Sequence, residues 1–407
     1  AAANISGEPF QLWAGPVGFA AGAEWRSESI VAVADARSEA NGWQTGNRKG
    51  TRGEIEVKEV YGEVNLPLIA DQPWTRALDL NGAIRYTDYS SSGGVVTWKV
   101  GATWEIVDGL LVRGTRSRDI RAGNLGELFT AVSTATTSGL RNPVSGESSP
   151  ALVVTRGNPT LSPEEADTWT AGVSYSPGWL DGFRFSVDYY NIQINGAIGT
   201  LTPQQIVDRC FLDQLDQFCA LVQTNASGRI TQVETTQLNL NKFETSGLDF
   251  EALYRTPLDL SDSLRGDLSL RLLANYVEKL ATTAAINAQV TDPAGEYTTP
   301  HWSVFGTIGY NVGRLRTVLD LRWYEGGAIN NTLTEGAISA TGVNINHVDS
   351  TFYANTTLTY TLDEAKDQEI FLRINNLFNT WPPFPSNGGD IFDELGRNFR
   401  IGFRSAI

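Results

Sequence analysis

The strongest constraint in this sequence is a period of two. Over segments of about 9–13 residues, a length that crosses a bilayer as a tilted strand, apolar and polar side chains alternate. Between Phe399 and Phe403, for example, the odd positions are Phe, Ile and Phe, whereas the even positions are Arg and Gly. This pattern predicts strands with one apolar and one polar face. A terminal strand exposes an edge unless it pairs, and closure against a first strand would provide that partner.

The pattern recurs in about 14 segments, and no stretch approaches the ~18 consecutive apolar residues of a membrane helix. A soluble sandwich also alternates, but its inner face is apolar and its outer face is polar. Here the apolar face carries aromatic residues near the segment ends, and the other face carries charges of both signs with glycine, as in membrane barrels. We therefore predict an all-β fold, an antiparallel transmembrane β-barrel. The expected strands are residues 17–26, 57–67, 78–87, 97–106, 110–121, 168–176, 183–194, 245–254, 267–277, 302–311, 316–324, 351–361, 369–376 and 398–407.

The connections between these segments differ in length at the two ends of the expected strands. Val107–Gly109, Gly178–Gly182 and Gly313-Arg314 are turns, and 256–264 and 362–368 are somewhat longer. The opposite ends carry long connections without evident elements of their own, and Ser90–Gly94 is the short exception. This asymmetry is typical of outer-membrane barrels, and long loops are usually functional. The long connections are residues 32–52, 122–163, 196–243, 279–300, 326–348 and 380–396.

Two arginines conflict with the alternation. Parity places Arg116 and Arg118 on the apolar side of their segment, together with Val112. An arginine near the midplane of a bilayer costs about 2–4 kcal/mol, and the cost falls towards zero at the interface. We expect both arginines at the outer rim, where they meet lipid phosphates. A β-bulge that turns them inward is the alternative.

Charge and cysteine content exclude some classes of function. The net charge of -15 argues against nucleic acid as a partner, because phosphate binding needs a basic surface. Cys210 and Cys219 lie close together outside the strand pattern, so we expect a disulfide in an oxidising compartment, worth roughly 2–3 kcal/mol. Two unpaired small hydrophobic residues are the alternative. Zinc is not expected, because His301 and His347 are the only histidines and no CxxC accompanies them.

The sequence contains no catalytic motif: HExxH, GxSxG, a P-loop and a dinucleotide fingerprint are all absent. We therefore expect neither an enzyme nor a cofactor. Two acidic groups have the oxygen ligands that a divalent cation needs, but they lack a regular spacing, so solvated loop charge is favoured and no metal is expected. The groups are Glu164, Glu165 and Asp167, and Asp390, Asp393 and Glu394.

Charged residues on the polar face are expected to line a lumen. There they would pair with one another or with a polypeptide that fills it, and direct contact with a substrate is the alternative. These residues are Glu24, Arg26, Glu59, Glu63, Arg85, Lys99, Arg113, Asp119, Arg121, Arg271, Asp320 and Arg322.

Four motifs follow one another along the chain. Arg121–Phe129 reads RAGNLGELF, Gly157–Glu164 reads GNPTLSPE and Ser246–Glu251 reads SGLDFE. The fourth and most specific is INNLFNTWPP at Ile374–Pro383, with Asp393–Arg397 after it. They resemble, in the same order, the RAPN-x-x-ELF, GNP-x-L-x-PE, GLDFE and NNLFN-x-x-PP segments of the TonB-dependent outer-membrane receptors. Together the four segments and their strands cover most of the chain.

The resemblance implies about 22 strands around an N-terminal plug, and uptake driven by the periplasmic protein TonB acting through that plug. The plug, its energy-coupling box and roughly the first third of such a barrel have no counterpart here. We therefore expect residues 1–407 to be the C-terminal part of the barrel, and the rest to be a second chain or a removed segment. Two departures stand out: Gly123 replaces the family's usual Pro, and the chain ends in Ile407 rather than Phe.

The resemblance also implies an integral protein of a Gram-negative outer membrane, in contact with outer-membrane lipid and lipopolysaccharide. Its small-molecule ligand would be a ferric siderophore, cobalamin or an oligosaccharide, with a slight preference for a glycan or other organic nutrient. Few His and no Met argue against a bare soft metal ion. A passive porin-like channel and a structural or adhesive platform are the alternative functions. Because aromatic and polar groups at loop bases commonly grip such ligands, the candidates are Trp43, Arg48, Tyr89, Tyr297, Tyr324 and Glu325.

Overall fold

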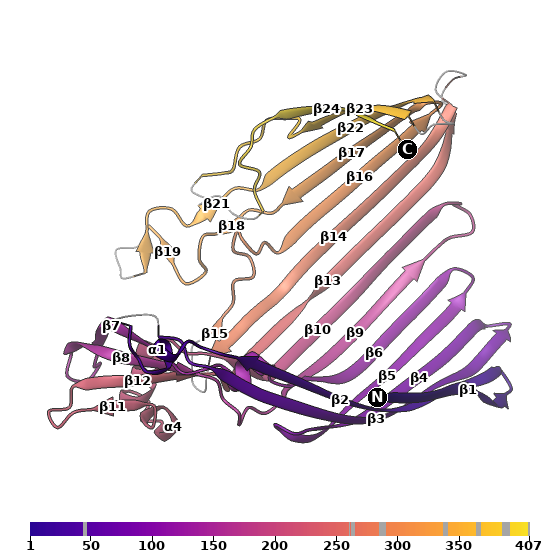
Figure 1. Cartoon of the computed structure of the whole chain (residues 1–407). Coiled ribbons are helices and arrows are strands. Elements are labelled where there is room, and N and C mark those ends of the chain that lie inside the picture. Colours follow the sequence, from indigo (N-terminus) through magenta and orange to yellow (C-terminus); the bar gives the residue numbers. More distant parts are fainter. Residues whose placement is uncertain are drawn as a thin grey trace.

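The computed structural model describes residues 1–43, 47–259, 261, 265–284, 290–336, 341–363, 368–384 and 391–405. One antiparallel sheet dominates these residues, and its strands follow one another in sequence order along a single path (Figure 1). The path consists of β1 (Ala2–Leu12), β2 (Gly15–Ala32), β3 (Thr51–Gln72), β4 (Thr75–Tyr89), β5 (Gly93–Val107), β6 (Leu110–Arg121), β9 (Glu164–Tyr175), β10 (Phe183–Gly199), β13 (Leu238–Asp259), β14 (Arg265–Ala284), β16 (Trp302–Val312), β17 (Leu315–Tyr324), β22 (Thr351–Asp363), β23 (Gln368–Asn375) and β24 (Asn398–Arg404).

The predicted all-β antiparallel fold is confirmed, and each expected segment forms one strand from β2 to β24. The sequence pattern missed β1. The register of β1 on β2 shifts between Gly7 and Phe10. Because of this bulge, Ile5 and Phe10 have opposite parity, yet they pair with Ala21 and Val17 and lie on the same face of the sheet. The bulge breaks the period of two from which the other strands were recognised.

Several strands are longer than the alternation predicted. β3 and β13 each have 22 residues and β14 has 20, about twice the 9–11 that cross a bilayer. β3 starts at Thr51 and β14 reaches Ala284, so both extend into the expected long connections. In these extensions the outer side chains are polar: Lys242 and Lys279 bind Glu244 at 3.1 and 3.2 Å. The extensions therefore lack the apolar parity that marks the rest of each strand.

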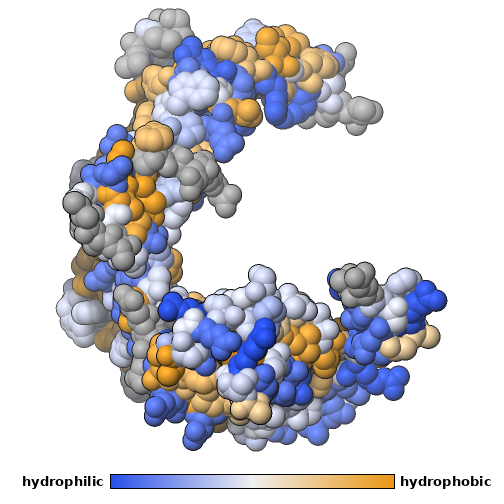
Figure 2. Space-filling model, turned by 90° about the vertical axis from the view of Figure 1, so that its left-hand side faces the viewer, coloured by the Kyte–Doolittle hydropathy of each residue, from blue (hydrophilic) through white to orange (hydrophobic). Residues whose placement is uncertain are grey.

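The sheet curls into an open wall. β1 and β24 lie at its two edges, so the two termini are far apart (Figure 1). The long connections leave the sheet at one end, on the left in Figure 1, and the turns lie at the other end. Seen from the end with the long connections, the wall forms an open curve around a hollow (Figure 2). Helices of a length and hydropathy suited to crossing a membrane are absent from the described part of the chain.

Arg116 and Arg118 remain on the outward side of the sheet. β6 pairs with β5 and β9 without a shift at these positions, so the β-bulge alternative is wrong. Both arginines bind Asp167 of β9, at 3.0 and 2.9 Å. The Arg116 guanidinium also lies over the Trp169 ring, 4.9 Å from its centroid, and 6.0 Å from that of Trp98. Ion pairing and aromatic contact thus offset the cost of charge on this face; their height in the membrane stays a prediction.

Two long connections fold together. The one between β6 and β9 contains α2 (Leu125–Phe129), β7 (Ser133–Arg141) and β8 (Ser148–Arg156), and the one between β10 and β13 contains α3 (Pro203–Phe211), α4 (Asp216–Cys219), β11 (Val222–Thr224) and β12 (Ile230–Thr236). The strands form a second sheet in the order β11-β12-β8-β7, in which β8 and β12 pair in parallel across the two connections. We call this sheet with α3 and α4 the cap. The expectation that these connections lack elements of their own is wrong.

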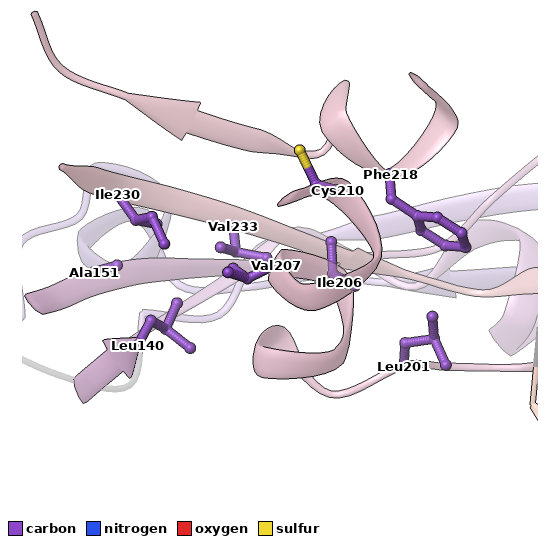
Figure 3. Close-up of a cluster of buried hydrophobic side chains, with 9 residues drawn as sticks. All are labelled: Leu140, Ala151, Leu201, Ile206, Val207, Cys210, Phe218, Ile230 and Val233. Carbon is purple, nitrogen blue, oxygen red and sulfur yellow. The ribbon is translucent and has the colours of Figure 1, made fainter. Parts of the chain in front are cut away.

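The cap has its own hydrophobic core (Figure 3). Val207 of α3, Phe218 of α4 and Val233 of β12 are fully buried in it. Leu140 and Ala151, from the other connection, pack into the same cluster. The other seven of the nine buried residues come from the β10–β13 connection, so burying Leu140 and Ala151 against them holds the two connections together.

Helix α3 of the cap has a recognisable start signal. The Thr202 hydroxyl accepts the Gln205 N–H, the Gln205 side chain accepts the Thr202 N–H, and Pro203 occupies the first turn. One residue before the end of α3, Cys210 forms a disulfide with Cys219 of α4, and the predicted pairing is confirmed.

Smaller elements lie in the remaining connections. α1 (Ala36–Glu39) lies between β2 and β3, and β15 (Val290–Thr291) pairs with β14. Between β17 and β22, β18 (Gly327–Ala328) pairs with β21 (His347–Val348), and β19 (Thr334–Glu335) pairs with β20 (Gly342–Val343).

We predict that Phe218→Ala opens the cap without unfolding the wall. Removing a fully buried aromatic ring leaves a cavity and costs about 3–5 kcal/mol. Hydrogen exchange of the β12 amides should accelerate accordingly, while that of β4 and β5 stays unchanged. Leu212→Ala, next to α3 but 60% exposed, is the matched control and should cost under about 0.5 kcal/mol. Equal exchange in both variants would contradict the assigned core.

Candidate functional site

The strand registers connect one set of side chains across the whole wall, and we call the side that they share the inner face. The outer face carries exposed large apolar side chains such as Phe19, Val60, Val100 and Trp169. The predicted lumenal residues all fall on the inner face, and their lining of a lumen stays a prediction. By register they are Glu24, Arg26, Glu59, Glu63, Arg85, Lys99, Arg113, Asp119, Arg121, Arg271, Asp320 and Arg322.

Glu59 is the centre of a charge cluster on β2, β3 and β4. Its side chain is 5% exposed, and Arg26 and Arg85 approach it from the two neighbouring strands at 3.0 and 3.5 Å. The Thr87 hydroxyl donates to its other oxygen at 3.0 Å. A carboxylate this buried is stable only when it is paired and hydrogen-bonded. Glu24 joins the cluster through Arg26, at 3.3 Å.

Arg113 and Asp188 form an ion pair across an intervening strand. Arg113 lies on β6 and Asp188 on β10, and their two hydrogen bonds, of 2.8 and 2.6 Å, pass over Gly172 of β9. A Cβ at Gly172 would lie 2.0 Å from an Asp188 carboxylate oxygen and 3.1 Å from Arg113 Nε. The absence of a side chain at Gly172 is therefore what permits the pair. On β14, Arg271 binds Glu251 of β13, which lies diagonally across the strand pair, at 3.0 Å.

Arg121 joins two of the sequence motifs. Its guanidinium binds Glu127 of α2 at 2.9 Å and Glu164 at the start of β9 at 2.6 Å. Glu127 also closes a capping box with Asn124, the residue before α2. The Glu164 carboxylate also accepts the backbone N–H of Ile198 on β10, at 2.7 Å. A guanidinium can bind two carboxylates at once. Arg121 therefore links the start of the β6–β9 connection, at α2, to its end at Glu164.

α2 reaches across the short β4–β5 turn to the first residues of β3. Leu128 packs in a buried cluster with Ile55, and Phe129 lies where a side chain at Gly53 would be, 2.2 Å from the ideal Cβ. The backbone N–H of Gly157 donates to Thr130 just after α2. The short Ser90–Gly94 connection, the exception in the sequence pattern, leaves the space that this crossing needs.

Three of the ligand candidates lie over β2–β4. Arg48 lines a cavity of about 540 Å³ with Ile30, Lys49 and Val132. Trp43 lies outside its lining, with the Arg37 guanidinium 4.9 Å above its ring. Tyr89 lines a separate cavity of about 360 Å³ with Glu63, Lys99 and Asp119.

The 540 Å³ cavity is also bordered by Asp35, which caps α1. The Ser38 hydroxyl and the backbone N–H groups of Ser38 and Arg37 hydrogen-bond to its carboxylate and so lower the Asp35 pKa. A lowered pKa stabilises this turn at neutral pH, and the contribution is lost as the pH falls through the lowered value.

The other three candidates lie on the far part of the wall. Tyr297 is 8% exposed and stacks on Phe392 with ring centroids 6.0 Å apart. Tyr324 is also buried and meets the ring of Phe305 edge-on. The Glu325 carboxylate accepts the backbone N–H of Trp302 at 3.0 Å. The six candidates are therefore divided between two places and do not form one site, and a ligand role for any of them stays a prediction.

The Asn residues of the fourth motif shape the connection after β23. Asn376 and Asn379 both have positive φ, 51° and 54°, a conformation that Asn tolerates better than most residues. Asn376 is fully buried and its amide exchanges two hydrogen bonds with the Thr380 backbone. Asn379 accepts the N–H of Arg397. These contacts hold the connection on the inner side of β22, where the Tyr353 hydroxyl accepts the Asp393 N–H.

The predicted acidic groups act in ion pairs and turns. Glu164 and Asp167 bind the arginines described above, Glu165 lies 3.6 Å from Arg118, and Asp393 accepts the N–H of Leu395. Asp390, like the terminal Ile407, lies outside the described residues. Among the described residues no group of three or more His, Cys, Asp or Glu is placed to hold a metal ion.

The architecture and motifs agree with a comparison against protein families. The family model described as TonB dependent receptor-like, beta-barrel matches residues 2–377. The chain belongs to this family. Its members are outer-membrane β-barrel receptors of Gram-negative bacteria, and it is not an enzyme family.

Solved structures show the same fold. The siderophore receptor PirA from Acinetobacter baumannii is 16% identical, with 93% of this chain and 50% of that chain covered and a TM-score of 0.59. A mutant ferric enterobactin receptor, PfeA, from Pseudomonas aeruginosa is 15% identical, with 93% and 48% covered and a TM-score of 0.62. The iron transporter FrpB from Neisseria meningitidis is 13% identical, with 98% and 53% covered and a TM-score of 0.56. At these identities the likeness shows the fold alone, and the chain spans about half the length of these structures.

Sequence reasoning missed the acidic partners on the inner face. Asp188 and Glu251 pair with Arg113 and Arg271, but parity alone cannot show which strands are neighbours. It also passed over the arginines of the last two strands, although the alternation there placed Arg400 on the polar face. Residue parity, read together with strand order, would have found them.

We predict that Gly172→Ala destabilises the barrel although it adds one methyl group. The new Cβ must displace Asp188 and break its pair with Arg113, at a cost of about 1–3 kcal/mol. Gly114→Ala on the neighbouring strand is the control, because its nearest contact would be an ordinary 3.6 Å. The readout is the temperature at which the folded band disappears in unheated-versus-heated gel electrophoresis. The same transition temperature in both variants would refute the assigned role of Gly172.

We predict that Arg121→Lys loosens α2 while it keeps the charge. Lysine cannot hold Glu127 and Glu164 in the same planar geometry, and the loss of charged hydrogen bonds costs about 1–3 kcal/mol at this half-exposed site. Hydrogen exchange of the α2 amides should accelerate. Arg209→Lys, which has the single helix partner Asp213, should have an effect under about 0.5 kcal/mol. Unchanged α2 protection in Arg121→Lys would show that the pairs are incidental.

Proposed function

We propose that this chain is the C-terminal barrel part of an energy-coupled outer-membrane receptor that takes up a scarce nutrient. The observation that carries the proposal is the family match over residues 2–377 on a curled antiparallel sheet with a charged inner face. An outer face of exposed apolar side chains suits lipid and the lipid part of lipopolysaccharide.

The two free edges of the sheet support a larger barrel. Backbone groups along the open edges of β1 and β24 need partners, because an unpaired polar group in hydrocarbon costs several kcal/mol. With the described strands as the larger part of a barrel of about 22 strands, roughly seven more strands close it. We propose that a segment outside residues 1–407 supplies these strands and the plug that fills the lumen.

In the proposed mechanism the apical connections capture the ligand, and the periplasmic protein TonB then pulls on the plug to open a path. The wall itself has to stay rigid while the plug moves. The ion pairs of Glu59, Arg113 and Arg271, which connect different strands, give it that rigidity. Arg121 fixes α2 to the start of β9, and the cap lies at the same end of the wall, beside the proposed entrance (Figure 1).

The names of the similar structures put ferric siderophores first in a ligand screen, followed by cobalamin and oligosaccharides. Of the six candidates, Arg48 is the one that borders the large apical cavity over β2 and β3. We propose this cavity as the first place to probe.

The deciding experiment is intact mass and N-terminal sequencing of the protein from outer membranes, with and without heating. We expect a polypeptide of plug-plus-strands size, either continuous with residues 1–407 or copurifying with them. Ligand binding then follows by titrating that complex with ferric chelates, cobalamin and oligosaccharides. A chain that stands alone as a heat-modifiable barrel would end the receptor proposal in favour of a passive pore or platform.

A further inference from the structure

The inner face changes its charge towards the C-terminal end of the wall. On β16–β24 the described inner positions carry five arginines but only two carboxylates, Asp320 and Glu369. The arginines are Arg316 and Arg322 on β17, Arg373 on β23, and Arg400 and Arg404 on β24. We call these five residues the arginine wall.

The arginine wall is poorly neutralised by the rest of the described chain. Elsewhere on the inner face, Arg26, Arg113 and Arg121 each bind a carboxylate at 3.0 Å or less. Within the described residues, the wall has a single ion pair, from Arg404 to Glu369 at 3.5 Å. Among the residues that the structure describes, Arg373 hydrogen-bonds only to the amide oxygen of Asn375.

Two features make this arrangement costly without a partner. Arg373 and Arg400 stand directly opposite each other in the β23–β24 register, and like charges at facing positions repel. The guanidinium of Arg322 lies over the Tyr353 ring, 5.4 Å from its centroid, and its Nε is buried without a hydrogen-bond partner. Buried donors of this kind normally have an acceptor, and none of the described residues supplies one.

We propose that the arginine wall binds an acidic face of the polypeptide that fills the lumen, an inference that rests on the proposed function. The wall and its partner would form the counterpart of the ion pairs that Glu59, Asp188 and Glu251 make on β2–β14. Carboxylates on the plug would lie between Arg373 and Arg400. Others would reach Arg322, which lies nearer the end of the wall with the long connections.

The dimensions of the wall favour a polypeptide over a small diffusible anion. Arg316 and Arg322 are six positions apart on one strand, which corresponds to roughly 20 Å. A small anion contacts two or three of the arginines, whereas a protein surface covers them all. The repulsion between Arg373 and Arg400 also exists at all times, so its partner has to be present in the resting receptor and not only during transport.

The test uses the full receptor purified from outer membranes, with the double variant Arg373→Gln/Arg400→Gln. The control is Arg184→Gln/Arg255→Gln, which removes the same charge from inner positions on β10 and β13. Unfolding of the plug is followed by its protease sensitivity over a urea series, at 50 mM and 500 mM NaCl, with the heat-modifiable band as the check on the barrel. We expect the test variant to lower the plug midpoint by roughly 0.5–1 M urea at low salt. The difference should shrink at high salt, because ions screen the attraction, and the control should keep the original midpoint.

The outcomes separate the inference from the function on which it rests. An unchanged plug midpoint in Arg373→Gln/Arg400→Gln overturns the inference and leaves the receptor proposal standing. If that variant instead loses uptake of an anionic ligand with its plug midpoint intact, the wall serves the permeating ligand and the inference is again overturned. A receptor without any lumenal polypeptide removes the proposed function and this inference together.

Discussion

Hydrogen bonding from strand to strand is the interaction on which the rest of this molecule depends. From β2 to β23 each strand of the main path has a neighbour on both sides, so the backbone needs little from side chains or solvent. Because the backbone groups are already paired, the side chains on the two faces can differ: one face is apolar and suits lipid, and the other is charged. The same pairing sets the neighbours of every inner charge, because register decides which carboxylate faces which guanidinium.

An inner charge is stabilised by the arrangement of the partners around it, and not by the number of charges on the inner face. Glu59 is stable because two arginines and a hydroxyl converge on it from β2 and β4. Arg113 and Asp188 meet across a whole strand only because Gly172 has no side chain in their way. Several inner charges before β16 thus neutralise one another in pairs, whereas the arginine wall, as we propose, depends on a partner. The inner face therefore has one part with ion pairs inside the sheet and another part whose arginines are mostly without carboxylate partners among the described residues.

The sequence was most informative where one face of a strand is uniformly apolar. In β5, for example, Trp98, Val100 and Trp104 mark the outer face, and strands of this type were all recognised. The alternation failed at β1, where a bulge reverses the parity. It also failed where β13 and β14 extend into the long connections, because the outer side chains there are polar. Local periodicity contains no information on these cases.

The predictions about the site were limited for a different reason. Membership of the inner face follows from parity, so the charged residues were placed correctly on one side of the sheet. Their partners, such as Asp188 for Arg113, depend on which distant strands become neighbours. The cap was missed because its core, including Val207 and Leu140, forms only when two connections meet. The apical candidates were chosen by type, and the fold separated Arg48 from Tyr297.

The parallel pairing of β8 with β12 has a consequence for how this surface can diversify. Each of the two connections completes the sheet and the core of the other. They therefore form a single folding unit, although the 36 residues Glu164–Gly199 lie between them. A transplanted or recombined segment would have to include both connections, from Arg121 to Leu238, to remain folded. Variation of the cap should therefore come as exchange of that whole stretch, or as point changes at its exposed residues.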